Sequence, residues 1–135
     1  MENHLETIQD WLAAVNAQDA ERLVELSDSN IEIVGPRGSA YGHETLLQWL
    51  ERAGLSLENQ RIFVRGNRVV IAQHAVWRSV ENAELVGEAD VASEFTVENQ
   101  KVVKYARYDT LDEALENAGL DYSDEKSNRT NHLDK

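Results

Sequence analysis

The sequence predicts an α+β fold in which helices pack on one face of a curved antiparallel sheet. Two observations predict it. Up to Gly54, most apolar residues recur with the helical period of about 3.6 residues, whereas after Gly54 they alternate as they do in strands. The later strand patterns are joined as hairpins, so these strands are expected to pair in antiparallel order with the helices gathered against them.

Three helices are expected before Gly54. The first covers residues 4–17, where a capping-box spacing precedes an apolar face made of Leu5, Ile8, Leu12 and Val15. Asp19 is expected to cap a short second helix in "DAERLVELS", and "HETLLQWLERAG" is expected to form the third, which Gly54 ends. Between them, "NIEIV" alternates as a short strand, and a glycine-bearing loop, "GPRGSAYG", follows it.

Four strands are expected after Gly54, in residues 58–65, 68–79, 88–97 and 101–109. Tight turns join the first pair at "GN" and the last pair at "ENQ". A terminal helix, "TLDEALENAGL", begins at a capping box and stops at a glycine. The remaining "DYSDEKSNRTNHLDK" has almost nothing to bury. We therefore expect one domain over residues 1–120 and a disordered polar tail over residues 121–135.

Composition excludes several classes of function. The net charge of −12 disfavours binding to phosphate backbones, so neither nucleic acid nor an anionic membrane is an expected partner. The chain has no cysteine, which excludes disulfides, thiolate metal sites and cysteine nucleophiles. No apolar run is long enough to span a bilayer, and the acidic first ten residues do not resemble a signal peptide. These features together predict a cytoplasmic protein.

Familiar cofactor motifs are absent from the sequence. The loop before the third helix has several glycines, but Gly42 is followed by "HET" where a phosphate-binding loop needs a lysine and a hydroxyl residue. Neither a "GxSxG" nucleophile elbow nor a dinucleotide fingerprint occurs. The four histidines are scattered without metal-ligand spacing. We therefore expect no metal and no cofactor.

The strand over residues 68–79 is apolar on both faces, because its odd and even positions are both rich in Val, Ile and Ala. A sheet that is covered on only one face would alternate cleanly. We therefore expect a second copy of the chain to cover the face away from the helices, which makes a homodimer through the sheet. The polar side chains of the strands either line an interior pocket or face solvent, and the sequence alone does not decide between these.

Three stretches carry a resemblance to a known family: "WLAAVNAQDAERLVELSDSNIEI", "GPRGSAYGHETLLQWL" and "KVVKYARYDTLDEALENAGL". Over roughly residues 4–120, their order resembles the cone-shaped, cystatin-like α+β roll shared by nuclear transport factor 2, ketosteroid isomerase and the SnoaL-like polyketide cyclases. The resemblance implies that the glycine-bearing loop lies at the open end of a cone, with Arg37, Tyr41 and His43 over the entrance. Ketosteroid isomerase places a tyrosine in its first helix, whereas this chain has Trp11 and no tyrosine there.

Asp109, Arg107 and His74 are the candidate catalytic residues. Asp109 ends the last strand, where the resemblance implies a carboxylate that faces the cavity, and Arg107 lies on the same face two residues earlier. Such a pair orients a polar group or holds a carboxylate as a base, although Asp109 is also placed to cap the terminal helix. His74 suits general base chemistry at neutral pH, or it is a structural or interface histidine.

Six further residues are candidates for binding a ligand. Trp11 and Trp77 offer apolar surface; aromatic residues at helical spacing usually belong to the core, and Trp77, beside Arg78 near a strand end, is the better candidate for a pocket wall. Tyr41 and Tyr105 offer hydroxyl donors, and Arg37 lies in the loop at the expected entrance. Glu94 shares a strand face with Asp90, where either carboxyl faces solvent or is buried with a raised pKa.

The sequence therefore predicts a SnoaL-like protein that binds a small, mostly apolar ligand. If it is an enzyme, the resemblance implies cofactor-independent cyclisation, isomerisation or hydration near a carbonyl. Asp109 is then the expected base, and Arg107 and a tyrosine stabilise negative charge. The alternative is a non-catalytic module for ligand binding, dimerisation or protein interaction, because this fold hosts many functions.

Overall fold

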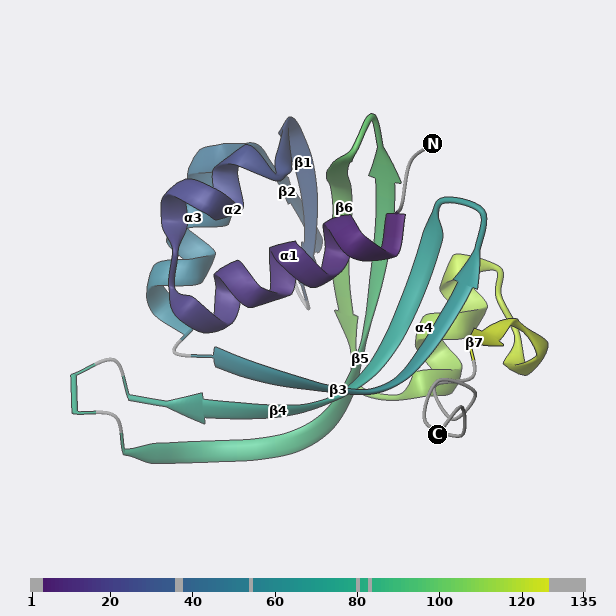
Figure 1. The fold of residues 1–135 in the computed structure, drawn as a ribbon. Helices are drawn as coiled ribbons and strands as arrows, with labels where there is room; N and C mark the ends of the chain where they lie inside the picture. The colour runs from purple at the N-terminus through teal and green to yellow at the C-terminus, as the bar shows by residue number, and fades with distance from the viewer. Residues whose placement is uncertain (1–3, 36–37, 54, 80, 83, 127–135) are drawn as a thin grey trace, which may run out of the picture.

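The computed structural model describes residues 4–35, 38–53, 55–79, 81–82 and 84–126 of the chain, and it confirms the α+β fold (Figure 1). The α-helices of these residues are α1 (His4–Ala17), α2 (Ala20–Glu25), α3 (His43–Ala53) and α4 (Leu111–Ala118). The strands are β1 (Ser27–Gly35), β2 (Gly38–Tyr41), β3 (Leu55–Arg65), β4 (Arg68–Arg78), β5 (Leu85–Glu98), β6 (Lys101–Tyr108) and β7 (Glu125–Lys126). A single-turn 3-10 helix, Tyr122–Asp124, precedes β7.

The strands form one curved sheet in the order β2-β1-β6-β5-β4-β3-β7. Strands β3 to β6 pair as the expected antiparallel meander. Strand β1 pairs in parallel with β6, a feature that the sequence analysis did not predict. Residues 38–41, expected to be loop, form β2, which pairs with β1 and extends the sheet beyond the meander.

Local signals place the helix ends largely as predicted. The Asp19 side chain accepts a hydrogen bond from the backbone N–H of Arg22 at the start of α2. Thr110 caps α4 by accepting from the backbone N–H of Glu113 at 3.2 Å, and Gly119 ends α4 in the left-handed region at φ 78°. The capping box expected at the start of α1 includes Asn3, which lies outside the described residues.

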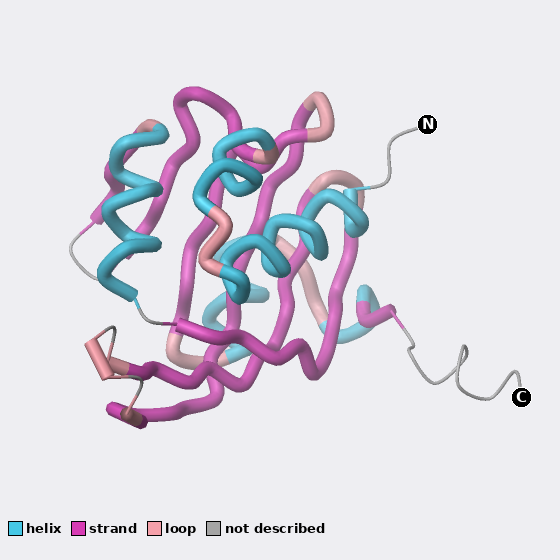
Figure 2. Tube along the Cα trace, turned by 60° about the vertical axis from the view of Figure 1, so that its left-hand side comes forward, coloured by secondary structure: helices cyan, strands magenta, loops and turns pink. Residues whose placement is uncertain are grey.

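Helices cover both faces of the sheet, not one face as predicted. Helices α1, α2 and α3 lie against the concave face, and α4 lies against the opposite face (Figures 1 and 2). The main core lies under α1 and includes Ile8, Trp11, Leu12, Val15, Ile71, Phe95 and Tyr105. No helix of the described residues is long and apolar enough to cross a membrane.

The second apolar face of the sheet is therefore covered in part by the chain itself. Phe63, Val70 and Ala92 are buried against α4, where they pack with Ala114, Leu115, Ala118 and Leu120. The sequence analysis assigned this cover to a second molecule because it did not place the terminal helix on a face. Farther along the same face, Ala72 and Val76 remain half-buried. The homodimer stays a prediction that would use this part of the sheet.

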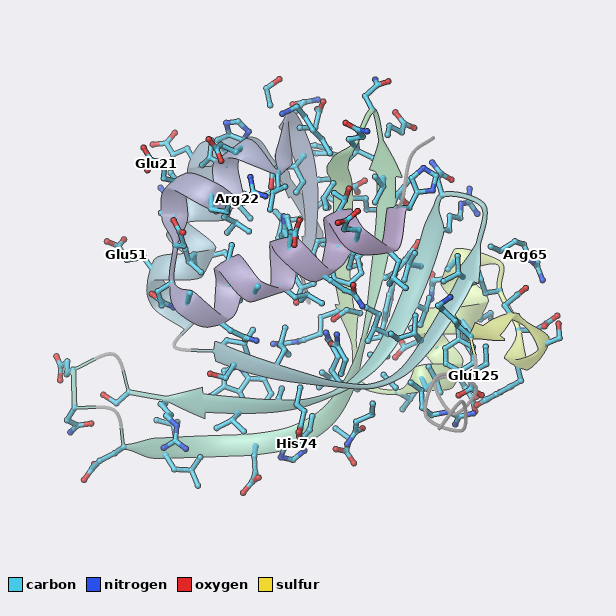
Figure 3. The ribbon with its side chains drawn as sticks, in the orientation of Figure 1. Glu21, Arg22, Glu51, Arg65, His74 and Glu125 are labelled. Atoms are coloured by element: carbon cyan, nitrogen blue, oxygen red, sulfur yellow. The ribbon has the colours of Figure 1, made fainter. Side chains whose placement is uncertain are left out.

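Residues 121–126 are ordered against β3, contrary to the disordered tail expected from residue 121, and residues 127–135 lie outside the described part of the chain. The Tyr122 ring packs edge-on against Phe63, with ring centroids 5.8 Å apart. Arg61 binds Glu125 at 2.7 Å, and Arg65 binds Asp124 at 2.7 Å. Contacts with side chains of β3 thus order residues 121–126, although the sequence of this segment is mostly polar. Arg65 and Glu125 are labelled in Figure 3.

Replacing Tyr122 with alanine is expected to lower the melting temperature by several degrees, because the ring anchors this segment on Phe63. Tyr41 is a matched control, since its exposed fraction is 55% against 52% for Tyr122. Tyr41→Ala should change the melting temperature much less. Thermal unfolding followed by circular dichroism makes the comparison, and equal shifts for the two variants would show that residues 121–126 add no stability.

Candidate functional site

A pocket of about 370 Å³ lies where β1 and β6 separate. The two strands pair as far as Val34 and Ala106; β1 then turns toward β2, while β6 continues for two more residues. This leaves a notch beside the end of β6. The pocket is lined by Ile33, Val34, Gly35, Trp49, Tyr105, Arg107, Tyr108, Asp109 and Glu113. The notch thus gathers charged, phenolic and apolar groups from β1, β6, α3 and α4.

Arg107 is the cation of the pocket. Its side chain is half-buried, and its guanidinium carbon lies 5.2 Å from the centroid of the Trp77 ring. Within the described part of the chain, this guanidinium makes no hydrogen bond and no ion pair with another side chain. Guanidinium donors favour the planar oxygens of carboxylates and related groups. Arg107 is therefore available to bind an oxygen of a ligand.

Tyr105 presents a second group that is not satisfied. The side chain is only 2% exposed, and its hydroxyl has no hydrogen-bond partner among the described residues. Burial raises the pKa of the phenol, while Ser93 and the charge of Arg107 oppose this rise. The Ser93 hydroxyl itself donates to Gln73 Oε1 at 2.6 Å. Ser93 lies close enough to lower the pKa of the phenol, but its own proton is used by Gln73, so the Tyr105 hydroxyl has hydrogen-bonding capacity that a ligand oxygen bound beside Arg107 would fill.

Asp109 and Glu113 supply carboxylates at the α4 side of the pocket. Asp109 is exposed, and it forms no hydrogen bond or ion pair with any other described residue. The helix cap at this point is Thr110, so Asp109 is not used as the N-cap. The pocket therefore contains an aspartate that is free to act on a ligand near Arg107.

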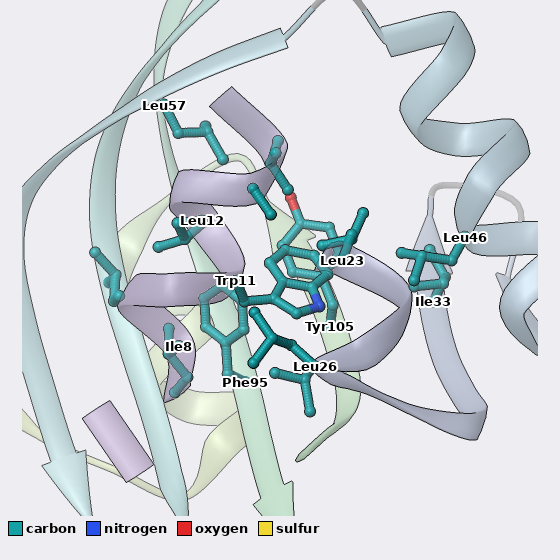
Figure 4. Close-up of a cluster of buried hydrophobic side chains, with 14 of the residues drawn as sticks. Ile8, Trp11, Leu12, Leu23, Leu26, Ile33, Leu46, Leu57, Phe95 and Tyr105 are labelled. Atoms are coloured by element: carbon teal, nitrogen blue, oxygen red, sulfur yellow. The ribbon is translucent and has the colours of Figure 1, made fainter. Parts of the chain in front are cut away.

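Aromatic rings form a cluster in the core, of which Figure 4 shows Trp11, Phe95 and Tyr105. Trp11 lies within 6.0 Å, centroid to centroid, of each of Trp49, Phe95 and Tyr105. Its indole N–H donates to Ser27 Oγ at 2.9 Å, and the side chain is fully buried. Trp11 is thus a core residue away from the pocket, while Trp49 and Tyr105 present surface to both the cluster and the pocket.

His74 lies on the face of the sheet that points away from α1 (Figure 3). Its ring nitrogens lie 2.9 Å from Asp90 Oδ1 and 2.8 Å from Glu88 Oε1. These carboxylates, Asp90 first, raise the pKa of the imidazole above its ordinary value. His74 is therefore held in a surface charge cluster, and the structure does not bring it to Asp109 and Arg107.

The other predicted ligand residues are scattered. Trp77 supports Arg107, whereas Tyr41 is exposed on β2 and does not line the pocket. Glu94 is buried behind Tyr108 on the outer face of the sheet, and Arg37 lies outside the described residues. The described residues contain no cluster of three or more His, Asp or Glu side chains that could hold a metal ion.

Sequence reasoning did not assign Trp49 or Glu113 to the site. Both were expected only as parts of helices, and both reach the pocket because α3 and α4 flank the notch at the end of β6. No local signal in the sequence marked them, because their place in the site depends on how α3 and α4 pack beside the end of β6.

Residues 8–105 match the SnoaL-like domain family, and the chain belongs to this family. No curated protein matches the chain. An NTF2-like protein from Burkholderia xenovorans is 25% identical, with a TM-score of 0.63, over 85% of this chain and 94% of that one. TerC, co-crystallised with polyporic acid, is 19% identical, with a TM-score of 0.68, over 84% and 98% of the two chains. RV0760c from Mycobacterium tuberculosis, solved in complex with estradiol-17beta-hemisuccinate, is 15% identical, with a TM-score of 0.68, over 80% and 94%.

Proposed function

We propose that the pocket binds a small, mostly apolar molecule that presents a carbonyl or carboxylate oxygen to Arg107. The observation that carries this proposal is the half-buried Arg107 guanidinium, which stacks on Trp77 but makes no hydrogen bond or ion pair with a described side chain, together with the buried Tyr105 hydroxyl, which has no hydrogen-bond partner among the described residues. Trp49, Ile33 and Val34 supply apolar walls for a ring. TerC has been co-crystallised with polyporic acid and RV0760c has been solved with estradiol-17beta-hemisuccinate, which supports an acidic ligand here.

We further propose cofactor-independent acid–base chemistry at a carbon next to the bound carbonyl. The Asp109 carboxylate removes a proton from that carbon, and the electron pair of the broken C–H bond moves onto the carbonyl oxygen to give an enolate. Arg107 and Tyr105 donate hydrogen bonds to the developing oxyanion. The protonated Asp109 then returns its proton to carbon, at the same or a neighbouring position, which completes an exchange or an isomerisation.

A non-catalytic binding role is the second candidate, and the exposure of Asp109 favours it. An exposed carboxylate is solvated, and water weakens its action as a base on a carbon acid. The two candidates share the Arg107 contact and differ only in whether Asp109 moves a proton. Loss of proton exchange on replacing Asp109 with asparagine supports the catalytic role, and ligand binding without any exchange supports the non-catalytic role.

Binding is tested by titrating the protein with 2-naphthoate while the fluorescence of the tryptophans is recorded, because Trp49 lines the pocket. We expect saturable quenching, and Arg107→Met should weaken the affinity by about 10-fold to 100-fold, the value of a hydrogen bond to a charged group. The net charge of −12 gives the protein no general attraction for an anion, so binding reports the local guanidinium.

Arg22→Met is the matched control for this titration. Arg22 is an exposed arginine on α2 that pairs with Asp10 and Glu25 and does not line the pocket (Figure 3). This variant should bind 2-naphthoate as the natural protein does. Equal affinities for the Arg107 and Arg22 variants would contradict the proposal.

A further inference from the structure

Glu94 is a buried carboxylate that does not line the pocket but contacts a residue that does. It is only 2% exposed, on the face of β5 toward α4. The Tyr108 hydroxyl donates to Glu94 Oε1 at 3.0 Å, and Lys104 Nζ lies 3.5 Å from Oε2. Tyr108 itself lines the pocket. Tyr108 thus connects the pocket to a carboxylate that solvent does not reach.

The hydrogen bond to Glu94 determines whether the Tyr108 hydroxyl can donate a hydrogen bond to a ligand or only accept one. A phenol has a single proton, and here that proton is directed to Glu94. Burial, and then the negative charges of Glu94, Glu113 and Glu32, raise the pKa of Tyr108 to about 12, so the phenol keeps its proton at neutral pH. The remaining lone pairs of the phenol oxygen accept hydrogen bonds but cannot donate one.

The pocket therefore has two chemically different sides, because successive side chains of β6 point to opposite faces of the sheet. Tyr105 and Arg107 lie on one face and are hydrogen-bond donors. Tyr108 lies on the other face, where it packs toward α4, and it and Glu113 of α4 are acceptors. The apolar side chains of Ile33, Val34 and Trp49 complete the lining. A ligand with a single polar oxygen would satisfy only the first side, and a ligand with a hydroxyl at its far end would satisfy both.

We infer that the natural ligand carries a hydroxyl group opposite its carbonyl or carboxylate, and that Glu94 is the positioning residue that makes Tyr108 accept a hydrogen bond from this hydroxyl. The inference rests on the proposed function, because the carbonyl or carboxylate must first be oriented by Arg107. It extends that function by defining the ligand as a molecule with two polar ends. Glu94 acts only through Tyr108 and does not contact the ligand.

Three ring acids that differ at one position test the inference. They are 2-naphthoate, 6-hydroxy-2-naphthoate and 6-methoxy-2-naphthoate, of which only the hydroxy acid can donate at the far end. The natural protein should bind the hydroxy acid about threefold to tenfold more tightly than the methoxy acid, which corresponds to one neutral hydrogen bond. Glu94→Gln should abolish this preference, because a glutamine amide can donate to the phenol oxygen and release the phenol proton.

Tyr108→Phe is the second variant, and it should also bind the hydroxy and methoxy acids equally. The melting temperature checks that both variants remain folded, and the readout is the ratio of the affinities for the hydroxy and methoxy acids within each variant. If all three acids bind the natural protein equally and Arg107→Met still weakens them, the present inference is overturned while the proposed function stands. If the natural protein binds none of the three, both are overturned.

Discussion

Replacing Asp109 with asparagine is expected to reduce proton exchange on a carbonyl probe by about 10²-fold to 10⁴-fold, the usual contribution of a general base. The probe is 2-tetralone in deuterated water, and the measurement is the rate of deuterium incorporation beside its carbonyl by NMR. Asparagine has nearly the size of aspartate but cannot take up a proton. Because the cap of α4 is Thr110, the substitution should leave the melting temperature unchanged.

Glu113→Gln is the matched control, since Glu113 also lines the pocket but is not assigned as the base. It should keep most of the exchange activity. If the natural protein catalyses no exchange above the buffer rate and still binds 2-naphthoate, the catalytic proposal fails and the non-catalytic binding role is retained. Unfolding of the Asp109→Asn protein would show that this carboxylate stabilises the fold instead.

Replacing Trp11 with alanine is expected to lower the free energy of unfolding by about 3–5 kcal/mol, the usual cost of removing a large buried aromatic side chain. Trp11 is fully buried, its ring packs against three other aromatic rings, and its N–H is satisfied by Ser27. The loss therefore combines a cavity with a Ser27 hydroxyl that loses a partner. Urea unfolding at equilibrium measures it.

Trp77→Ala provides the comparison, because Trp77 is only half-buried and packs at the margin of the same core. Its replacement should cost clearly less than the replacement of Trp11. Equal losses would mean that the aromatic cluster around Trp11 is not the centre of the core. The Trp77 variant should also weaken 2-naphthoate binding slightly, since its ring lies under the Arg107 guanidinium.

Much of the fold could be predicted because short sequence patterns indicate its strands, turns and helix starts. The strand-like apolar run over residues 68–79 and the hairpin residues around Gly66 predicted the meander, and Asp19 and Thr110 marked helix starts through their side-chain acceptors. The parallel pairing of β1 with β6 joins residues far apart in the sequence, and no local pattern encodes it. The order of residues 121–126 likewise depends on Arg61 and Arg65 of β3, which lie about 60 positions earlier.

The site was less predictable than the fold, because it depends on which face each strand residue occupies. Arg107 and Asp109 were selected together from their spacing, and both line the pocket. His74 was selected for its ordinary pKa, but strand parity places it on the outer face beside Asp90 and Glu88. Trp11 was selected as an aromatic residue of the first helix, and the Ser27 contact shows that it belongs to the core.

The most direct test of the account is a crystal structure of the protein soaked with 2-naphthoate. We predict that the carboxylate lies within hydrogen-bond distance of the Arg107 guanidinium and the Tyr105 hydroxyl, with the ring against Trp49. A naphthoate bound elsewhere, or a notch beside β6 that remains empty while the Arg107 guanidinium stays on the Trp77 ring, would contradict it.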